Sequence, residues 1–176
     1  MCGECIGENR GFQEGHSGFY FEDKLREALH AFKFQGRKDV GRHLVSLARE
    51  KIAALSPKID TIVPVPVTEK RLKARGFNQS FIISEEISRI TARPVEHMAL
   101  IKIKETSDQF TLAKDERRRN IKGVFAVKNP PAVAGKRVLL VDDLLTTGYT
   151  VREAARVLHR ARARSLTVFA LARTPS

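Results

Sequence analysis

Two adjacent carboxylates, followed by hydroxyl side chains around a glycine, are the residues of this sequence best suited to chemistry. Asp142 and Asp143 follow the apolar run 138–141, and Thr-Thr-Gly-Tyr-Thr at 146–150 leads into a helical pattern. Gly148 permits a tight turn with inward-pointing N–H groups, and the N-terminus of the next helix adds positive partial charge. Such a loop suits a phosphate monoester, whereas adjacent carboxylates suit vicinal sugar hydroxyls. The segment therefore predicts a site for a ribose 5-phosphate.

A strand and a helix must position this segment. The continuous apolar run 138–141 predicts a central parallel strand that is buried on both faces. The acids would then lie at its carboxyl end, where open α/β sheets bind their ligands. An amphipathic helix over 150–163 and a last strand over 166–171 complete a strand–helix–strand unit. This spacing favours an α/β fold with a largely parallel sheet.

Hydrophobic spacing predicts further elements on the N-terminal side of the acids. They are helices over 22–34, 40–55 and 78–91, and strands over 61–63 and 123–127. The helix over 40–55 is expected to carry Leu47 on its inner stripe and to end at Ser56-Pro57. The stretch 102–120 is polar and has no sustained periodicity, so we expect a long exposed loop or arm. Loops of this length in a compact domain are often lids or binding loops.

Composition limits the class of protein. The 176 residues contain 32 Lys and Arg and 20 Asp and Glu, which gives a net charge of +12, and 42% are hydrophobic. This fits one globular domain with a proper core. No apolar run reaches the roughly 18 to 20 residues of a membrane span, and no secretory signal is visible at the N-terminus. Two cysteines exclude a disulfide framework, so a cytoplasmic protein is expected.

The positive charge is concentrated in the C-terminal part of the chain. Residues 101–176 hold 16 basic and 7 acidic side chains, whereas residues 1–100 hold 16 and 13. A basic half suggests a polyanionic partner, either nucleic acid or a phosphorylated small molecule. The alternative is a solvated surface that keeps the protein soluble. The five histidines are scattered, and no Ser/His/Asp or Cys/His arrangement supports hydrolysis.

The segment 138–150 resembles the phosphoribosyl pyrophosphate (PRPP) signature of type I phosphoribosyltransferases at all thirteen positions. In that family the two acids bind the ribose 2- and 3-hydroxyls, and the following loop binds the 5-phosphate. The PRPP-binding residues that this resemblance implies are Asp142, Asp143, Leu145, Thr146, Thr147, Gly148, Tyr149 and Thr150. A fortuitous strand–acid–turn–helix in another α/β protein is the alternative for any short motif.

Further motifs resemble the hallmarks of the competence protein F (ComF) family, and they extend the resemblance from about residue 19 onward. They are Val63-Pro-Val-Pro66, Arg71, Arg75-Gly-Phe-Asn-Gln79, Lys33-Phe34 with Gly36, and Thr106, Gln109, Leu112, Arg117, Arg119-Asn120 and Phe125. This combination separates the chain from nucleotide-salvage enzymes. The implied fold is α/β and type I phosphoribosyltransferase-like, with a mostly parallel central sheet flanked by helices.

The resemblance also implies roles for the basic segments. The loop over 64–75, which includes Val65, corresponds to the loop that holds pyrophosphate, with Arg71 and Arg75 pairing with phosphate oxygens. A solvated charged turn is the alternative. The 104–120 arm resembles a flexible catalytic loop that closes over PRPP. Catalytic roles then fall on Arg117 and Arg119 as charge stabilisers, beside the two acids.

The implied reaction is displacement of pyrophosphate from the sugar C1 by a nitrogen nucleophile. The protein positions the partners and stabilises a leaving polyanion, and needs no nucleophile of its own. Mg²⁺ is the implied cofactor, held mainly by pyrophosphate, ribose hydroxyls and water, so it needs few protein ligands.

The N-terminal Cys2-Gly-Glu-Cys5 resembles the last half of the family's zinc ribbon. A structural zinc site needs four ligands, and Cys2 and Cys5 supply only two. His16 or a partner chain would complete the site, or the segment is an inert remnant. We therefore expect a partial zinc-ribbon remnant over residues 1–18 and a phosphoribosyltransferase-like domain over residues 19–176.

Two functions follow from these observations. The first is a Mg²⁺- and PRPP-dependent transferase of the ComF family that acts in natural competence. The second is a non-enzymatic, single-stranded DNA-binding accessory protein that retains the PRPP fold and works beside a helicase-like partner.

The aromatic content is low, 7% with no Trp, which disfavours a stacking platform for DNA, so that DNA binding would be mostly electrostatic. A basic domain with a degenerate site ranks last because neither motif acid is replaced. Type I relatives also imply a homodimer.

Overall fold

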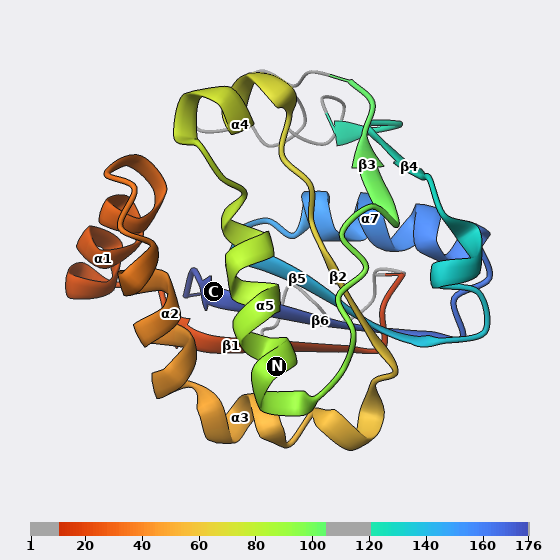
Figure 1. Cartoon of the computed structure of the whole chain (residues 1–176), viewed down its shortest axis with the longest axis horizontal. Coiled ribbons are helices and arrows are strands. Elements are labelled where there is room, and N and C mark those ends of the chain that lie inside the picture. The colour runs from red at the N-terminus through yellow and green to blue at the C-terminus, as the bar shows by residue number, and fades with distance from the viewer. Residues whose placement is uncertain (1–10, 105–120, 176) are drawn as a thin grey trace.

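The computed structural model describes residues 11–104 and 121–175, and its centre is a parallel four-stranded sheet (Figure 1). The strands are β1 (Glu14–Tyr20), β2 (Thr61–Pro64), β5 (Arg137–Leu145) and β6 (Ser165–Arg173). Their order is β1-β6-β5-β2, and each neighbouring pair is parallel. The expected α/β fold with a parallel central sheet is confirmed. None of the helices in these ranges is long and apolar enough to cross a membrane.

Helices cover both faces of this sheet. The helices that do so are α1 (Asp23–Phe34), α2 (Lys38–Leu47), α3 (Arg49–Ala53), α5 (Gln79–Thr91) and α7 (Tyr149–Arg160), whereas α4 (Glu69–Arg75) contributes to neither core cluster. Helices α1, α2, α3 and α5 contribute to one hydrophobic cluster, whereas α7 contributes to a second cluster on the other face. A small antiparallel pair, β3 (Leu100–Lys102) and β4 (Phe125–Val127), packs on the α7 side.

Alternation along β5 shows why this strand lies at the centre. Leu139 and Val141 face the cluster of α1, α2, α3 and α5, whereas Val138 and Leu140 face the cluster of α7. All four are at most 1% exposed. A strand with helices on both faces needs apolar residues at every position, which is the pattern of the predicted strand. The strand continues to Leu145, so Asp142 and Asp143 lie within its carboxyl end rather than after it.

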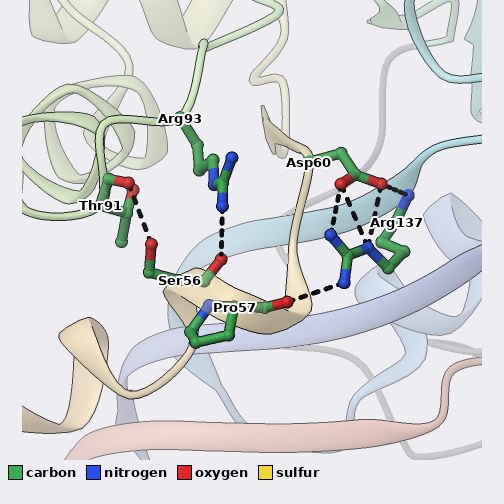
Figure 2. A network of polar contacts seen from close by, with 6 residues as sticks. All are labelled: Ser56, Pro57, Asp60, Thr91, Arg93 and Arg137. Atoms are coloured by element: carbon green, nitrogen blue, oxygen red, sulfur yellow. Dashed lines mark hydrogen bonds and ion pairs between the residues drawn. The ribbon is translucent and has the colours of Figure 1, made fainter.

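Figure 2 shows a polar network at the opposite, amino ends of β2 and β5. The backbone N–H of Arg137 donates to Oδ2 of Asp60 at 2.8 Å, and Nη2 of Arg137 donates to Oδ1 at 2.6 Å. Nη1 of Arg137 reaches the Pro57 carbonyl at 2.7 Å, and Arg93 donates to the Ser56 carbonyl nearby. The guanidinium of Arg137 holds the pKa of Asp60 well below its usual range. The network fixes β2 against β5 at the end away from the acids.

Strand β1 was not predicted because its sequence lacks a strand pattern. Gly15 and Gly18 weaken the local preference for an extended chain. A side chain at position 18 would bring its Cβ within 2.9 Å of the Leu171 carbonyl oxygen, so close packing against β6 needs glycine there. Since β1 begins at Glu14, the sheet extends to the N-terminal side of the domain boundary expected between residues 18 and 19.

The long helix expected over 40–55 is interrupted. It divides at Ala48 into α2 and α3, and Ser56 begins a short 3₁₀ turn. The expectation that Leu47 lies on the inner stripe was wrong, because the break leaves this side chain 62% exposed. Ala48, Ile52 and Leu55 are buried instead. The break at Ala48 therefore changes which positions face the core.

Candidate ribose 5-phosphate site

A small pocket opens at the carboxyl edge of the sheet, where β5 passes into α7. The residues that line it are Asp142, Leu144, Leu145, Thr146, Thr147, Gly148, Tyr149, Thr150 and Val151. The structure thus brings together around one pocket almost the whole segment expected to bind a ribose phosphate, with Asp143 adjacent in β5.

The turn at Gly148 shapes the phosphate side of this pocket. Gly148 has a φ of 74°, in the left-handed region that favours glycine, and it is the N-cap residue of α7. The helix begins at Tyr149, so its N-terminal partial charge points into the loop. The guanidinium of Arg152 lies 5.8 Å from the ring centroid of Tyr149 and adds a cation one turn into the helix. This geometry suits a bound anion.

The carboxylate of Asp142 is held by two donors. Its Oδ1 accepts a hydrogen bond from the Ser80 hydroxyl at 3.2 Å and another from the Asp143 backbone N–H at 2.9 Å. The pKa of the Asp142 carboxyl is raised to about 7, first by burial and second by the charge of Asp143, while these hydrogen bonds and the cation of Lys33 act in the opposite direction. Burial and the neighbouring Asp143 thus disfavour the charged form of this acid, whereas Lys33 and Ser80 favour it.

The other carboxylate has a cationic partner from the N-terminal part of the chain. Nζ of Lys33, near the end of α1, lies 2.9 Å from Oδ2 of Asp143, and the two side chains are only 14% and 15% exposed. Sequence reasoning singled out Lys33 within a motif without giving it a role. It missed Ser80 altogether, although this serine directly follows the Arg75–Gln79 motif.

The segment expected to hold pyrophosphate follows β2. Val65 is buried, and its N–H donates to the Val141 carbonyl at 2.8 Å, so the segment begins directly beside the end of β5. The expectation of a loop through 64–75 is corrected by α4, which carries both Arg71 and Arg75. The guanidinium of Arg75 lies 4.8 Å from the ring centroid of Phe34.

Sequence signals at both ends could have found α4. The Thr68 hydroxyl caps it by accepting from the Arg71 N–H, and Gly76 follows its last residue with a φ of 76°. A threonine before an acidic first turn, and a glycine after a basic last turn, are ordinary helix start and stop signals.

Several predicted site residues lie outside the described ranges. Arg117 and Arg119 belong to the segment 105–120, and Cys2 and Cys5 belong to the segment 1–10. Within the ranges that are described, no group of three or more His, Cys, Asp or Glu side chains could hold a metal ion. The catalytic role of the arginines and the zinc site therefore stay predictions.

Sequence comparisons agree with these features. The family model described as phosphoribosyl transferase domain matches residues 78–176, which is more than half of the chain. The DNA utilization protein YhgH of Escherichia coli (strain K12) is 32% identical over 180 residues, covering 98% of this chain and 78% of that protein. Competence protein F of Haemophilus influenzae is 29% identical with the same coverage, and competence protein ComFC of Bacillus subtilis is 28% identical, covering 99% and 72%.

Solved structures share the fold. Glutamine PRPP amidotransferase from B. subtilis, complexed with ADP and GMP, superimposes with a TM-score of 0.53 at 22% identity over 80% of this chain. The chain spans 30% of that enzyme's length. Adenine phosphoribosyl transferase from Trypanosoma brucei gives a TM-score of 0.50 at 15% identity and 80% coverage of this chain, which is 55% of its own length. The type I phosphoribosyltransferase-like fold is confirmed, and with the sequence matches it places this chain in the competence protein F (ComF) family, as a member that carries the phosphoribosyl transferase domain.

Proposed function

We propose that this chain binds PRPP, or a related ribose phosphate, in the pocket over 142–150 and acts in the use of imported DNA. One observation carries the proposal: two carboxylates lie beside a loop that turns at Gly148, carries threonine hydroxyls and leads into the N-terminus of α7. Relatives named for competence and for DNA utilization support the proposed process.

The pocket fits the two ends of a ribose 5-phosphate. Asp142 and Asp143 would accept hydrogen bonds from the ribose 2- and 3-hydroxyls, and ionised acids accept them most strongly. The 5-phosphate would lie in the loop over 146–150, where the helix N-terminus and three threonine hydroxyls donate. Mg²⁺, when bound with PRPP, supplies charge neutralisation on the pyrophosphate, and few protein ligands are needed to hold it.

Transfer of the phosphoribosyl group is the reaction that this arrangement could support. A nitrogen nucleophile bonds to C1 as the bond from C1 to the pyrophosphate oxygen breaks, and the leaving group departs as a polyanion. The protein's part is to orient the sugar and to stabilise that charge. We assign the stabilising role to Arg71 and Arg75 of α4 and to Arg117 and Arg119 of the predicted arm.

A second candidate function is binding of single-stranded DNA. The described residues place an exposed basic cluster at the far end of α7: it consists of Arg160, Arg162 and Arg164. Arg156 does not add a free charge, because its guanidinium pairs with the buried Glu153 at 2.6 Å. A twelve-residue helix is about 18 Å long. The basic cluster therefore lies well away from the phosphate loop at the start of α7.

One titration tests both candidates. We expect PRPP with Mg²⁺ to bind the full chain equally well with and without a single-stranded oligonucleotide, because the two sites lie at opposite ends of α7. The triple variant Arg160→Gln/Arg162→Gln/Arg164→Gln should lose oligonucleotide affinity and keep PRPP affinity. Binding of the oligonucleotide should weaken steeply between low and physiological salt. Displacement of PRPP by the oligonucleotide, or salt-independent DNA binding, would contradict this placement.

A further inference from the structure

The candidate site has two halves: the pyrophosphate segment that follows β2, and the acid pair of β5 with the loop after it. The motif Arg75-Gly-Phe-Asn-Gln79 and the serine after it contact both halves. Figure 1 shows this corner, where the chain leaves α4 at the top of the view and descends into α5, which lies in front of the sheet. Only Arg75 has a place in the proposed function so far. The next polar side chains each contact a different part of the site.

The first of them is Asn78, the N-cap residue of α5. Its Oδ1 accepts a hydrogen bond from the Ser80 N–H at 3.0 Å, which starts the helix. Its Nδ2 donates to the Val65 carbonyl at 3.1 Å. One side chain therefore fixes both the helix start and the peptide that begins the pyrophosphate segment.

The second is Gln79, which is 1% exposed. Its Oε1 accepts a hydrogen bond from Nη1 of Arg75 at 3.2 Å, and the same guanidinium lies over the Phe34 ring. The amide and the ring limit the directions that the guanidinium can take. The Arg75 guanidinium of α4 is thus tied to the first residue of α5 and the last residue of α1.

The third is Ser80, which is 3% exposed and donates to Oδ1 of Asp142 at 3.2 Å. The charged groups that face Asp142 are Asp143 on its own strand and Lys33 from α1, and Ser80 is its partner from α5. A donor is valuable here because it stabilises the ionised carboxylate in the place where burial disfavours charge.

We propose that residues 78–80 are positioning residues that set the pyrophosphate segment and the acid pair at a fixed spacing, an inference that rests on the proposed function. Three consecutive residues at the start of one helix hold Val65, Arg75 and Asp142. The helix start is itself held in the core, because Phe77 is 6% exposed and its ring lies 5.6 Å from the Phe32 ring. A ligand that contacts both halves then finds them already at the right spacing, which reduces the entropic cost of ordering the site on binding.

A serine one turn further along α5 provides a matched control. Ser84 is fully buried, and its hydroxyl has no hydrogen-bond partner among the residues that the structure describes. Ser80→Ala and Ser84→Ala remove the same atom from the same helix at similar burial. Only the first removes a contact with the site.

The experiment compares PRPP affinity and the Asp142 carboxyl pKa in the two variants and in wild-type full chain. We expect Ser80→Ala to weaken PRPP binding about tenfold, since a hydrogen bond to a charged group is lost. Carboxyl NMR titration of the ligand-free protein should show a higher Asp142 pKa in Ser80→Ala than in wild type. Ser84→Ala should match wild type in both measurements, and thermal unfolding confirms that both variants are folded.

The outcomes separate the inference from the proposed function. If wild type binds PRPP and Ser80→Ala binds it as well as Ser84→Ala does, the positioning role is overturned and the proposed function stands. If wild type binds no PRPP, the proposed function is overturned, and the carboxyl pKa still shows whether Ser80 acts on Asp142. An unchanged pKa in Ser80→Ala overturns the inference in either case.

Discussion

Lys33 and Asp143 form an ion pair across the candidate site, with 2.9 Å between Nζ and Oδ2. They come from α1 and β5, so the N-terminal helix reaches directly into the acid pair. Because both side chains are mostly buried, the pair is screened little by solvent. The motif Lys33-Phe34 and the PRPP signature, far apart in sequence, thus meet at one place.

Replacing Lys33 should affect both stability and binding. Lys33→Met leaves two neighbouring carboxyls without their cation, so we expect the free energy of unfolding to fall by about 2 kcal/mol. PRPP affinity should fall as well, because Asp143 loses the contact that orients it. Urea unfolding and a PRPP titration measure the two effects. Lys58→Met is the control, because Lys58 pairs with Glu14 at the surface, 3.0 Å away. If Lys33→Met lowers the free energy of unfolding no more than Lys58→Met does, the ion pair of Lys33 and Asp143 does not stabilise the fold.

Asp142→Asn should gain stability relative to wild type as pH rises. The pKa of Asp142 is about 7 in the folded chain, above its ordinary value of 3.8, so the folded state binds the extra proton between these values. Stability therefore falls as pH rises through this window, and the full cost remains above pH 7. Each pKa unit corresponds to about 1.4 kcal/mol, so between pH 4 and pH 8 we expect the stability of Asp142→Asn to rise relative to wild type by up to about 4 kcal/mol. A stability difference from wild type that does not change with pH would contradict the raised pKa.

Gly148→Ala should abolish the phosphate loop without a general loss of fold. The φ of 74° at this position costs a residue with a Cβ about 1 kcal/mol, and relaxing it would turn the loop's N–H groups away. Gly135→Ala is the matched control, because Gly135 has a φ of 72° and open space around it. We expect similar losses in melting temperature from both variants, and loss of PRPP binding from Gly148→Ala alone. Equal PRPP affinity in the two would show that the turn does not form the site.

The network in Figure 2 predicts an acid-sensitive contribution to stability. Because Arg137 lowers the pKa of Asp60, the stabilisation is present above its ordinary value of 3.8 and is lost as pH falls below it. The two side chains are 35% and 36% exposed, so after solvent screening we expect Asp60→Asn to cost about 1 kcal/mol at pH 7. The deficit should shrink in urea titrations below about pH 4. Asp39→Asn, which breaks the exposed pair with Arg37, should change little. A deficit that stays constant with pH would contradict the account.

Much of the fold was predictable because its signals are local. The run Val138 to Val141 is apolar at every position, as a strand with helices on both faces requires, and α5 keeps its helical spacing from Ile82 to Ile90. Strand β1 gave no such signal: Gly18 is set by the close approach of Leu171, a contact with a strand at the other end of the chain. Pairing with a distant strand, and not local preference, makes this segment extended.

In the candidate site, too, some features follow from local sequence and others depend on the packing of distant elements. The turn at Gly148 follows from local turn chemistry, and the residues that line its pocket are nearly those that the resemblance to the PRPP signature implied. The contacts of Lys33 and Ser80 with the acids depend on how α1 and α5 pack against β5, which no spacing in the sequence encodes. Motif membership identified Lys33 and the residues just before Ser80, but only the packed structure shows which carboxylate each one contacts.

The central claim is that the acid pair and the loop after it bind PRPP. Isothermal titration of the full chain with PRPP and Mg²⁺ tests it most directly, with Asp142→Asn/Asp143→Asn as the variant. This double variant keeps the shape of both side chains and removes their charge. We predict one saturable site in wild type and at least a hundredfold weaker binding in the variant, since two charge-assisted contacts are lost. No saturable binding to wild type, or equal binding to the variant, would contradict the account.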